Sequence, residues 1–392
     1  MRLQLSATAS PRISRDRLYK CCLVVVAVLF ALLAVEAALW LSAPIETDSY
    51  VYSVMQSIPG TKPVVALKSY RYGMRARAAP ARRKPTRTIR ILCLGGSTTE
   101  ALSQSSDDAW WGILEKMLTP QLAGQDVDIE ILAVGKSGFT VFEDLQWTVH
   151  HLREIDPDIV VTLLGINNLA WKGGPSYAYS AQDQTRRLAT AEAGSWRDTL
   201  EQRSQLVRRI IRVKRLFAQW RNLRTGRAID WHDIEAARRE YRGLAFVAQP
   251  IRKPDPLVEF ENDVGLLLEY LRQARIKEVI VLGQPVLWTE HPSSDDLDHY
   301  WFSIGTPAGR VRAAPQWLAR EMHRYNETQR RIADRFDFTY LDLALSVPPT
   351  TAAFFDDCHF TDEGNRIVAE AVFPTMVDAI RRTVLRLKPA AQ

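Results

Sequence analysis

The stretch Ile89-Arg90-Ile91-Leu92-Cys93-Leu94-Gly95-Gly96-Ser97-Thr98-Thr99 decides how this chain folds. Its first six residues are mostly apolar, which is typical of a buried strand. The glycine pair that follows lets the backbone turn sharply where the strand ends. We therefore expect the Ser97 hydroxyl at the carboxyl end of a strand, with a helix beginning just after it, near Glu100. A phosphate-binding turn is the alternative, but the lysine of a P-loop is absent.

Further apolar runs of strand length follow along the chain. They cover residues 127–134, 159–164 and 278–282, with a weaker run at 338–341. Helical patterns lie between several of these runs, and such alternation predicts a parallel sheet covered by helices on both faces. The expected fold class is α/β, a three-layer α/β/α sandwich around a five-stranded parallel sheet. Ligands of such sheets bind outside the carboxyl ends of the strands, where Ser97 falls.

The N-terminal part of the chain indicates a membrane anchor. Residues 21–43 are apolar apart from Glu36 and are long enough, as a helix, to cross a bilayer. Residues 1–20 are basic, whereas residues 44–60 carry no lysine or arginine, so the positive-inside rule predicts a cytoplasmic N-terminus. A cleaved signal peptide is the competing interpretation. We expect an uncleaved single-pass anchor, with the rest of the chain periplasmic or extracellular.

Two further segments interrupt the pattern. Residues 44–88 form a basic juxtamembrane linker, expected to be a solvated stalk, although its charge also suits anionic headgroups or an acidic polymer. The catalytic domain is expected at residues 89–387, with a helical insertion at 170–256 that shows no strand pattern. Within the insertion, residues 203–224 form a basic amphipathic helix that suits a membrane surface. The alternative is a helix whose apolar stripe packs on the domain.

A histidine and an aspartate precede the last helical pattern. Asp356 stands three residues before His359 on the same loop, so its carboxylate can bond the imidazole Nδ1–H and leave Nε2 to take a serine proton. Asp357 could take this role instead, but it stands only two residues before His359, a poorer spacing for a loop to close. The sequence thus provides a nucleophile, a base and the partner of that base.

Candidate donors for an oxyanion follow two other strands. Asn167 comes after Gly165 at the end of one apolar run, and Gly138 lies in the turn after another. With the backbone amide of Ser97, these residues could form a three-donor oxyanion hole. Each of them alone would be an ordinary turn residue.

Taken together and in this order, these segments resemble the SGNH or GDSL-type hydrolase family, in its GGSTT branch, over about residues 89–380. The resemblance implies a flavodoxin-like topology. It also implies that Ser97 is the nucleophile, that Gly138 and Asn167 are oxyanion donors with the Ser97 amide, and that His359 is the base paired with Asp356. Gly96 and Asn168 replace aspartates that are familiar in the family, which bears on substrate class more than on catalysis.

The sequence therefore predicts a membrane-anchored serine esterase. We expect it to hydrolyse O-acyl groups, chiefly acetyl, of an envelope glycan through an acyl-enzyme. A lipase or phospholipid acylhydrolase and an O-acyltransferase would use the same site. A carbohydrate-binding envelope protein with a decayed site is the non-enzymatic alternative.

No cofactor, metal or nucleic acid is expected. His150 and His151 are adjacent and lack zinc-ligand spacing, and the sequence pI of about 9.1 comes with no nucleic-acid-binding motif. The four cysteines form no disulfide framework. Cys93 and Cys358 flank the site and could pair if their Cα atoms came within about 7 Å, but we expect two buried thiols.

Overall fold

A computed structural model describes residues 15–42, 50–52, 58, 60–62, 67–81, 83–122, 127–170, 204–224, 234–252 and 255–387. The chain forms two compact units. One contains residues 1–46 and 195–220, and the other contains residues 47–194 and 221–392. Parts of the expected N-terminal segment, linker and insertion lie outside the described residues.

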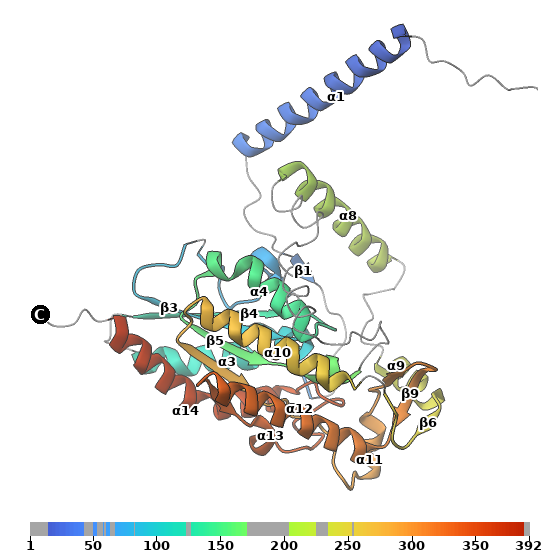
Figure 1. Ribbon diagram of the computed structural model, residues 1–392, viewed down its shortest axis with the longest axis vertical. Coiled ribbons are helices and arrows are strands. Elements are labelled where there is room, and N and C mark those ends of the chain that lie inside the picture. Colours follow the sequence, from blue (N-terminus) through green and yellow to red (C-terminus); the bar gives the residue numbers. More distant parts are fainter. Residues whose placement is uncertain are drawn as a thin grey trace, which may run out of the picture. The chain divides into compact units, whose positions relative to one another are not determined.

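The larger unit is built on a five-stranded parallel sheet (Figure 1). The strand order β10-β7-β5-β3-β4 corresponds to 2-1-3-4-5 along the chain, which is flavodoxin-like, as expected. Gly95 pairs with Gly135 on one side and with Leu163 on the other, so the carboxyl ends of the central strands are aligned. The strands are β3 (Thr88–Gly95), β4 (Asp128–Gly135), β5 (Ile159–Leu163), β7 (Glu278–Leu282) and β10 (Thr339–Leu341).

Helices cover both faces of this sheet and complete the three-layer sandwich (Figure 1). Strands β3, β5 and β7 are buried along their whole length, which explains their nearly continuous apolar sequences. One helix pair, α3 and α14, packs together, and α10 packs on both α4 and α12. Their bounds are α3 (Trp110–Leu118), α4 (Val141–Ile155), α10 (Pro256–Gln273), α12 (Pro315–Arg335) and α14 (Asp362–Leu387).

Shorter elements connect this framework. They are β1 (Tyr50–Tyr52), β2 (Leu67–Ser69), η1 (Arg71–Gly73), α2 (Ser97–Glu100), η2 (Thr119–Leu122), α5 (Ile166–Ala170), α9 (Ile234–Gly243), α11 (Ser294–His299) and α13 (Leu343–Ser346). A second small sheet contains β6 (Phe246–Val247), β9 (Gly309–Ala313) and β8 (Ile304–Thr306). The expectation of an insertion without strands is wrong at β6. This strand is two residues long and exists through pairing with β9, so it leaves no periodic pattern in its own sequence.

The basic linker is not a solvated stalk throughout. Tyr70, Met74 and Ala76 are buried, and the backbone of Arg75 exchanges two hydrogen bonds with Ala133 of β4. The segment therefore packs on the catalytic unit. The buried Arg75 guanidinium donates to the backbone oxygens at the end of α2 and just beyond it, those of Glu100, Ala101 and Gln104. Burial lowers the pKa of Arg75 to about 10, a value at which the group still carries its charge at neutral pH.

Replacing Arg75 by methionine is expected to lower the free energy of unfolding by about 2–4 kcal/mol, because buried carbonyl oxygens lose their donors. Arg77 is a matched control, since its ion pairs with Asp107 and Glu115 lie nearer the surface. Arg77→Met should cost less than about 1 kcal/mol. Chemical denaturation of the full chain measures both values, and equal losses would contradict the account.

The smaller unit contains α1 (Arg15–Ser42) and α8 (Gln205–Arg224) as far as residue 220. Within α1, Tyr19–Ser42 is long and apolar enough to cross a membrane, a property that signal sequences share. Glu36, the charge within this apolar stretch, accepts hydrogen bonds from the backbone N–H groups of Gln205 and Leu206 and from the Ser204 hydroxyl. Its carboxylate therefore stands at the N-terminus of α8, where the helix dipole favours a negative charge.

Candidate active site

Ser97 occupies a tight turn at the carboxyl end of β3. The helix after the turn begins at Ser97 itself and not near Glu100, because the N–H groups of Thr99 and Glu100 already donate to the carbonyl oxygen of Gly96. A Cβ atom at Gly95 would lie only 2.4 Å from the Leu163 carbonyl oxygen, so the close approach of β5 requires glycine there. This turn presents Ser97 at the aligned strand ends.

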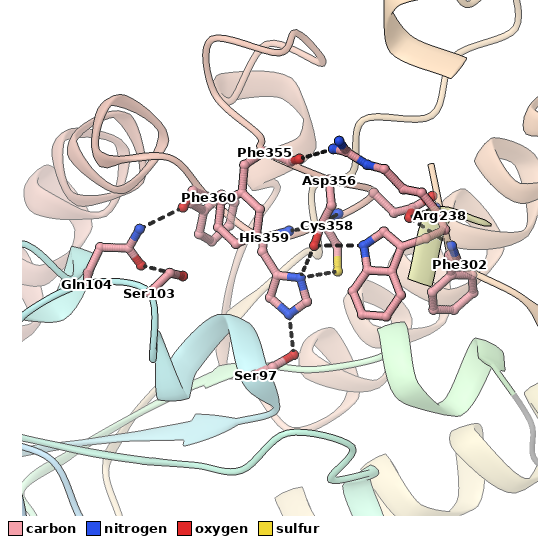
Figure 2. A network of polar contacts seen from close by, with 12 residues as sticks. Ser97, Ser103, Gln104, Arg238, Phe302, Phe355, Asp356, Cys358, His359 and Phe360 are labelled. Carbon is pink, nitrogen blue, oxygen red and sulfur yellow. Dashed lines mark hydrogen bonds and ion pairs between the residues drawn. The ribbon is translucent and has the colours of Figure 1, made fainter. Parts of the chain in front are cut away.

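The structure brings Ser97, His359 and Asp356 into one hydrogen-bonded line (Figure 2). The Ser97 Oγ lies 2.7 Å from His359 Nε2, and His359 Nδ1 lies 2.7 Å from Asp356 Oδ2. Ser97 is 8% exposed and Asp356 is 1% exposed. The geometry is that of a hydroxyl, a base and a carboxylate that orients the base.

Asp356 is held by its own loop, whereas Asp357 faces other partners. Asp356 Oδ1 accepts the backbone N–H groups of Cys358 at 2.9 Å and His359 at 2.8 Å. Asp357 accepts from the Trp288 indole and from the backbone of the loop that contains Trp301. Asp357 is therefore bound elsewhere and does not take the place of Asp356 beside the imidazole.

The electrostatics of the pair favour an imidazolium beside a carboxylate. Burial alone would lower the pKa of His359, but the charge of Asp356, the hydrogen bond to it and the neighbouring Cys358 raise that pKa well above its ordinary value. Burial alone would raise the pKa of Asp356, but the imidazolium charge, the bond to it and two backbone N–H groups hold that pKa below its usual value. The site is thus suited to a positive charge on His359 during reaction.

This pair sets an expectation for the pH dependence of hydrolysis. A general base acts in its neutral form, and a raised His359 pKa moves that form to higher pH. The midpoint of the acid limb of kcat/KM should therefore lie at a pH above the ordinary histidine pKa of about 6.5. Initial rates across a pH series measure the limb. A limb centred below about 6 would contradict the assigned environment.

The proposed oxyanion donors lie around the same turn. The Asn167 amide Nδ2 donates to the Phe139 carbonyl oxygen at 2.7 Å, and this bond uses one of its two N–H groups. A Cβ atom at Gly96 would lie 2.6 Å from that nitrogen, so glycine before the serine makes room for the amide. Gly138 has a φ of 85°, a left-handed conformation that favours glycine. Asn168 instead accepts from the Val141 N–H at the start of α4.

Several neighbours of the catalytic loop are not indicated by any sequence motif. The Phe355 ring stacks on the His359 imidazole at 5.6 Å, and the Trp301 ring lies nearly parallel to it at 6.5 Å. Arg238 of α9, within the expected insertion, donates to the Phe355 carbonyl oxygen at 3.0 Å (Figure 2). The insertion therefore supports the loop through α9. The contacts of Trp301 and Arg238 join residues far apart in the chain, so no local motif marks them.

One group of side chains near His359 has the composition of a metal site. Donor atoms of Asp356, Cys358 and His359 lie within 4.8 Å of one another, the one such group among the described residues. However, His359 Nδ1 and Asp356 already bond each other, and burial raises the pKa of Cys358 to about 11, which disfavours the thiolate that a metal needs. All four cysteines are free, and Cys93 and Cys358 are buried thiols.

A protein-family model matches most of this chain. The GDSL-like Lipase/Acylhydrolase family matches residues 93–367. No curated protein matches the chain.

Similar solved structures include two acetyl xylan esterases and TesA. The acetyl xylan esterase AlAXEase is 14% identical, with a TM-score of 0.39, and the match covers 73% of this chain and 99% of that one. Axe2, an acetylxylan esterase from Geobacillus stearothermophilus, is 14% identical, with a TM-score of 0.37 and coverages of 76% and 94%. TesA is 14% identical, with a TM-score of 0.39 and coverages of 74% and 99%.

Proposed function

The chain belongs to the GDSL-like lipase/acylhydrolase family and is an ester-hydrolysing enzyme, and we propose that it is a membrane-anchored serine esterase that removes acyl groups through an acyl-enzyme. The observation that carries this mechanism is the line of two 2.7 Å contacts from Ser97 through His359 to Asp356. A hydroxyl in that position loses its proton to Nε2 as it attacks an ester carbonyl.

In the proposed reaction, Ser97 Oγ bonds to the carbonyl carbon while His359 takes the hydroxyl proton. Asp356 stabilises the imidazolium, and the N–H groups of Ser97, Gly138 and Asn167 stabilise the oxyanion. His359 then gives the proton to the departing alcohol. A water molecule, deprotonated by the same imidazole, cleaves the acyl-enzyme and restores Ser97.

The substrate that we propose is an O-acyl group, chiefly acetyl, on an envelope glycan. It follows from the family and from an N-terminal anchor that would hold the catalytic domain, residues 89–387, outside the cytoplasm. The same proposal assigns residues 1–20 to a cytoplasmic N-terminus, residues 21–43 to the membrane anchor and residues 44–88 to the linker before the catalytic domain.

A lipid ester is a second candidate, because of the exposed face of α8. Ile210, Val213 and Phe217 recur at helical spacing on this helix and are about half exposed or more. Basic residues such as Arg208 and Lys214 accompany them, and this composition suits an anionic lipid surface. The contact of Glu36 with the start of α8 would hold the helix next to the anchor.

Acyl-chain preference separates these substrates. The full chain in detergent is assayed with p-nitrophenyl esters from acetyl to long acyl groups, and with an O-acetylated polysaccharide from which acetate is released. Preference for acetyl esters together with acetate release supports the glycan. Preference for long chains, raised by anionic vesicles, supports the lipid and overturns the glycan proposal. Acetylation of an added sugar in place of hydrolysis would identify a transferase.

A further inference from the structure

The Asp356 carboxylate has donors on both oxygens, and one of them comes from a distant residue. Oδ1 accepts two backbone N–H groups of its own loop, as described above. Oδ2, the oxygen that bonds His359 Nδ1 at 2.7 Å, also accepts the indole N–H of Trp301 at 3.0 Å. Trp301 lies 55 residues before Asp356 in the chain and belongs to the loop after α11.

Asp357 holds the backbone from which Trp301 projects. Its Oδ2 accepts the N–H groups of Trp301 at 2.7 Å and Phe302 at 2.8 Å, and its Oδ1 accepts the Trp288 indole at 2.7 Å. Asp357 is 1% exposed, so these bonds lie in the interior. Displacement of the donor groups would leave a buried carboxyl group without hydrogen-bond partners. The two adjacent aspartates therefore have different partners that meet at Trp301.

We propose that Trp301 is a positioning residue for the base: its indole N–H fixes the Asp356 oxygen that orients His359, and Asp357 holds Trp301 in place. The inference rests on the proposed function, because it assigns a role in the same site. Two donors on one carboxylate oxygen restrict rotation of the carboxylate, and the carboxylate in turn fixes the imidazole through Nδ1.

Trp301→Phe removes the indole N–H and keeps an aromatic ring. We expect kcat to fall roughly tenfold, the scale known for outer partners of metal-bound histidines, with KM nearly unchanged. A carboxylate that has lost a donor is more basic and stabilises the imidazolium more, so the acid limb of kcat/KM should move up by about half a pKa unit. Benzothienylalanine at position 301, in which sulfur replaces the indole N–H, should give the same result without a loss of volume.

Trp147→Phe is the matched control. Its indole donates to the Tyr72 carbonyl oxygen at 3.0 Å, a contact of α4 outside the catalytic loop, so kcat and the acid limb should stay unchanged. The titratable and charged groups around the catalytic loop are the same in both variants. Asp357 and Cys358 lie on the same loop as the pair. Tyr241 and Tyr300 interact with Asp357, and Arg238 of α9 donates to the Phe355 carbonyl oxygen.

The link to Asp357 is tested by a double-mutant cycle. Burial and the charge of Asp356 raise the pKa of Asp357 to about 7, so the cycle is measured at a pH well above this value. There Asp357→Asn removes a charge in every background, and this effect cancels in the cycle. If Asp357 acts through Trp301, its substitution should lower kcat several-fold less in Trp301→Phe than in the wild type. Additive losses would overturn this part of the inference.

A readout without substrate keeps this inference separate from the proposed function. In the full chain labelled with ¹⁵N-histidine, the His359 resonances are assigned by their loss in His359→Ala, and their titration midpoint is measured. A midpoint that rises in Trp301→Phe supports the positioning role, even if the wild type proves inactive and the proposed function fails. An unchanged midpoint, together with unchanged kcat where activity is present, would overturn it.

Discussion

Ser97→Ala is expected to lower kcat/KM for p-nitrophenyl acetate by roughly a million-fold, the scale known for removal of a catalytic serine. The reason is that His359 then faces a methyl group and no covalent intermediate can form. Hydrolysis that remains would come from the oxyanion donors and from binding alone. Initial rates of the full chain and the variant at equal concentration measure this ratio.

Ser103→Ala is the control for this substitution. Ser103 is also buried, but its hydroxyl donates to the Gln104 side chain at 3.2 Å and takes no part in the catalytic line. The control should keep the wild-type rate within a few-fold, as expected for a change outside the reacting groups. A Ser97→Ala protein that stays folded and retains more than about one hundredth of the activity would point to another nucleophile.

Asp356→Asn is expected to lower kcat about ten-thousand-fold, because the amide fixes the wrong imidazole tautomer. If the asparagine oxygen keeps the two backbone N–H donors, its NH₂ group faces His359 Nδ1. Nδ1 must then accept, and the proton moves to Nε2, which can no longer take the proton of Ser97. Loss of the negative charge should also lower the His359 pKa.

Asp378→Asn provides the comparison for Asp356→Asn. Asp378 lies on the exposed face of α14 and pairs with Arg381, so its substitution should leave kcat unchanged. Steady-state rates and the acid limb of kcat/KM are measured for both variants. A loss below tenfold in Asp356→Asn would show that another group, such as Asp357, orients the imidazole.

The sequence predicts the strands and the reacting groups because both leave local patterns. The central strands are buried on both faces, so β3 and β5 are nearly continuous apolar runs. Glycine follows these runs at Gly95 and Gly165. Asp356 and His359 lie three residues apart on one loop, so their contact is also local. The family resemblance rested on the order of these segments, and the match to residues 93–367 confirms the family.

What the sequence could not predict depends on contacts between distant segments. The basic character of residues 44–88 predicts a segment exposed to solvent. Arg75 is nevertheless buried, because carbonyl oxygens at the end of α2 and just beyond it accept its N–H groups. In the sequence, Glu36 is an isolated charge in an apolar stretch. In the structure its carboxylate accepts a backbone N–H group at the start of α8. Trp301 reaches Asp356 only through tertiary structure. None of these partners is marked by spacing along the chain.

Covalent labelling tests the central claim that His359 activates Ser97 as the nucleophile. The folded chain is treated with a fluorophosphonate, which reacts with activated serines and leaves a stable adduct, and the modified peptide is identified by mass spectrometry. The account predicts one phosphonyl group on the peptide that contains Ser97. Labelling should be absent in Ser97→Ala and far slower in His359→Ala. An adduct on a different residue, or equal labelling in His359→Ala, would contradict the account.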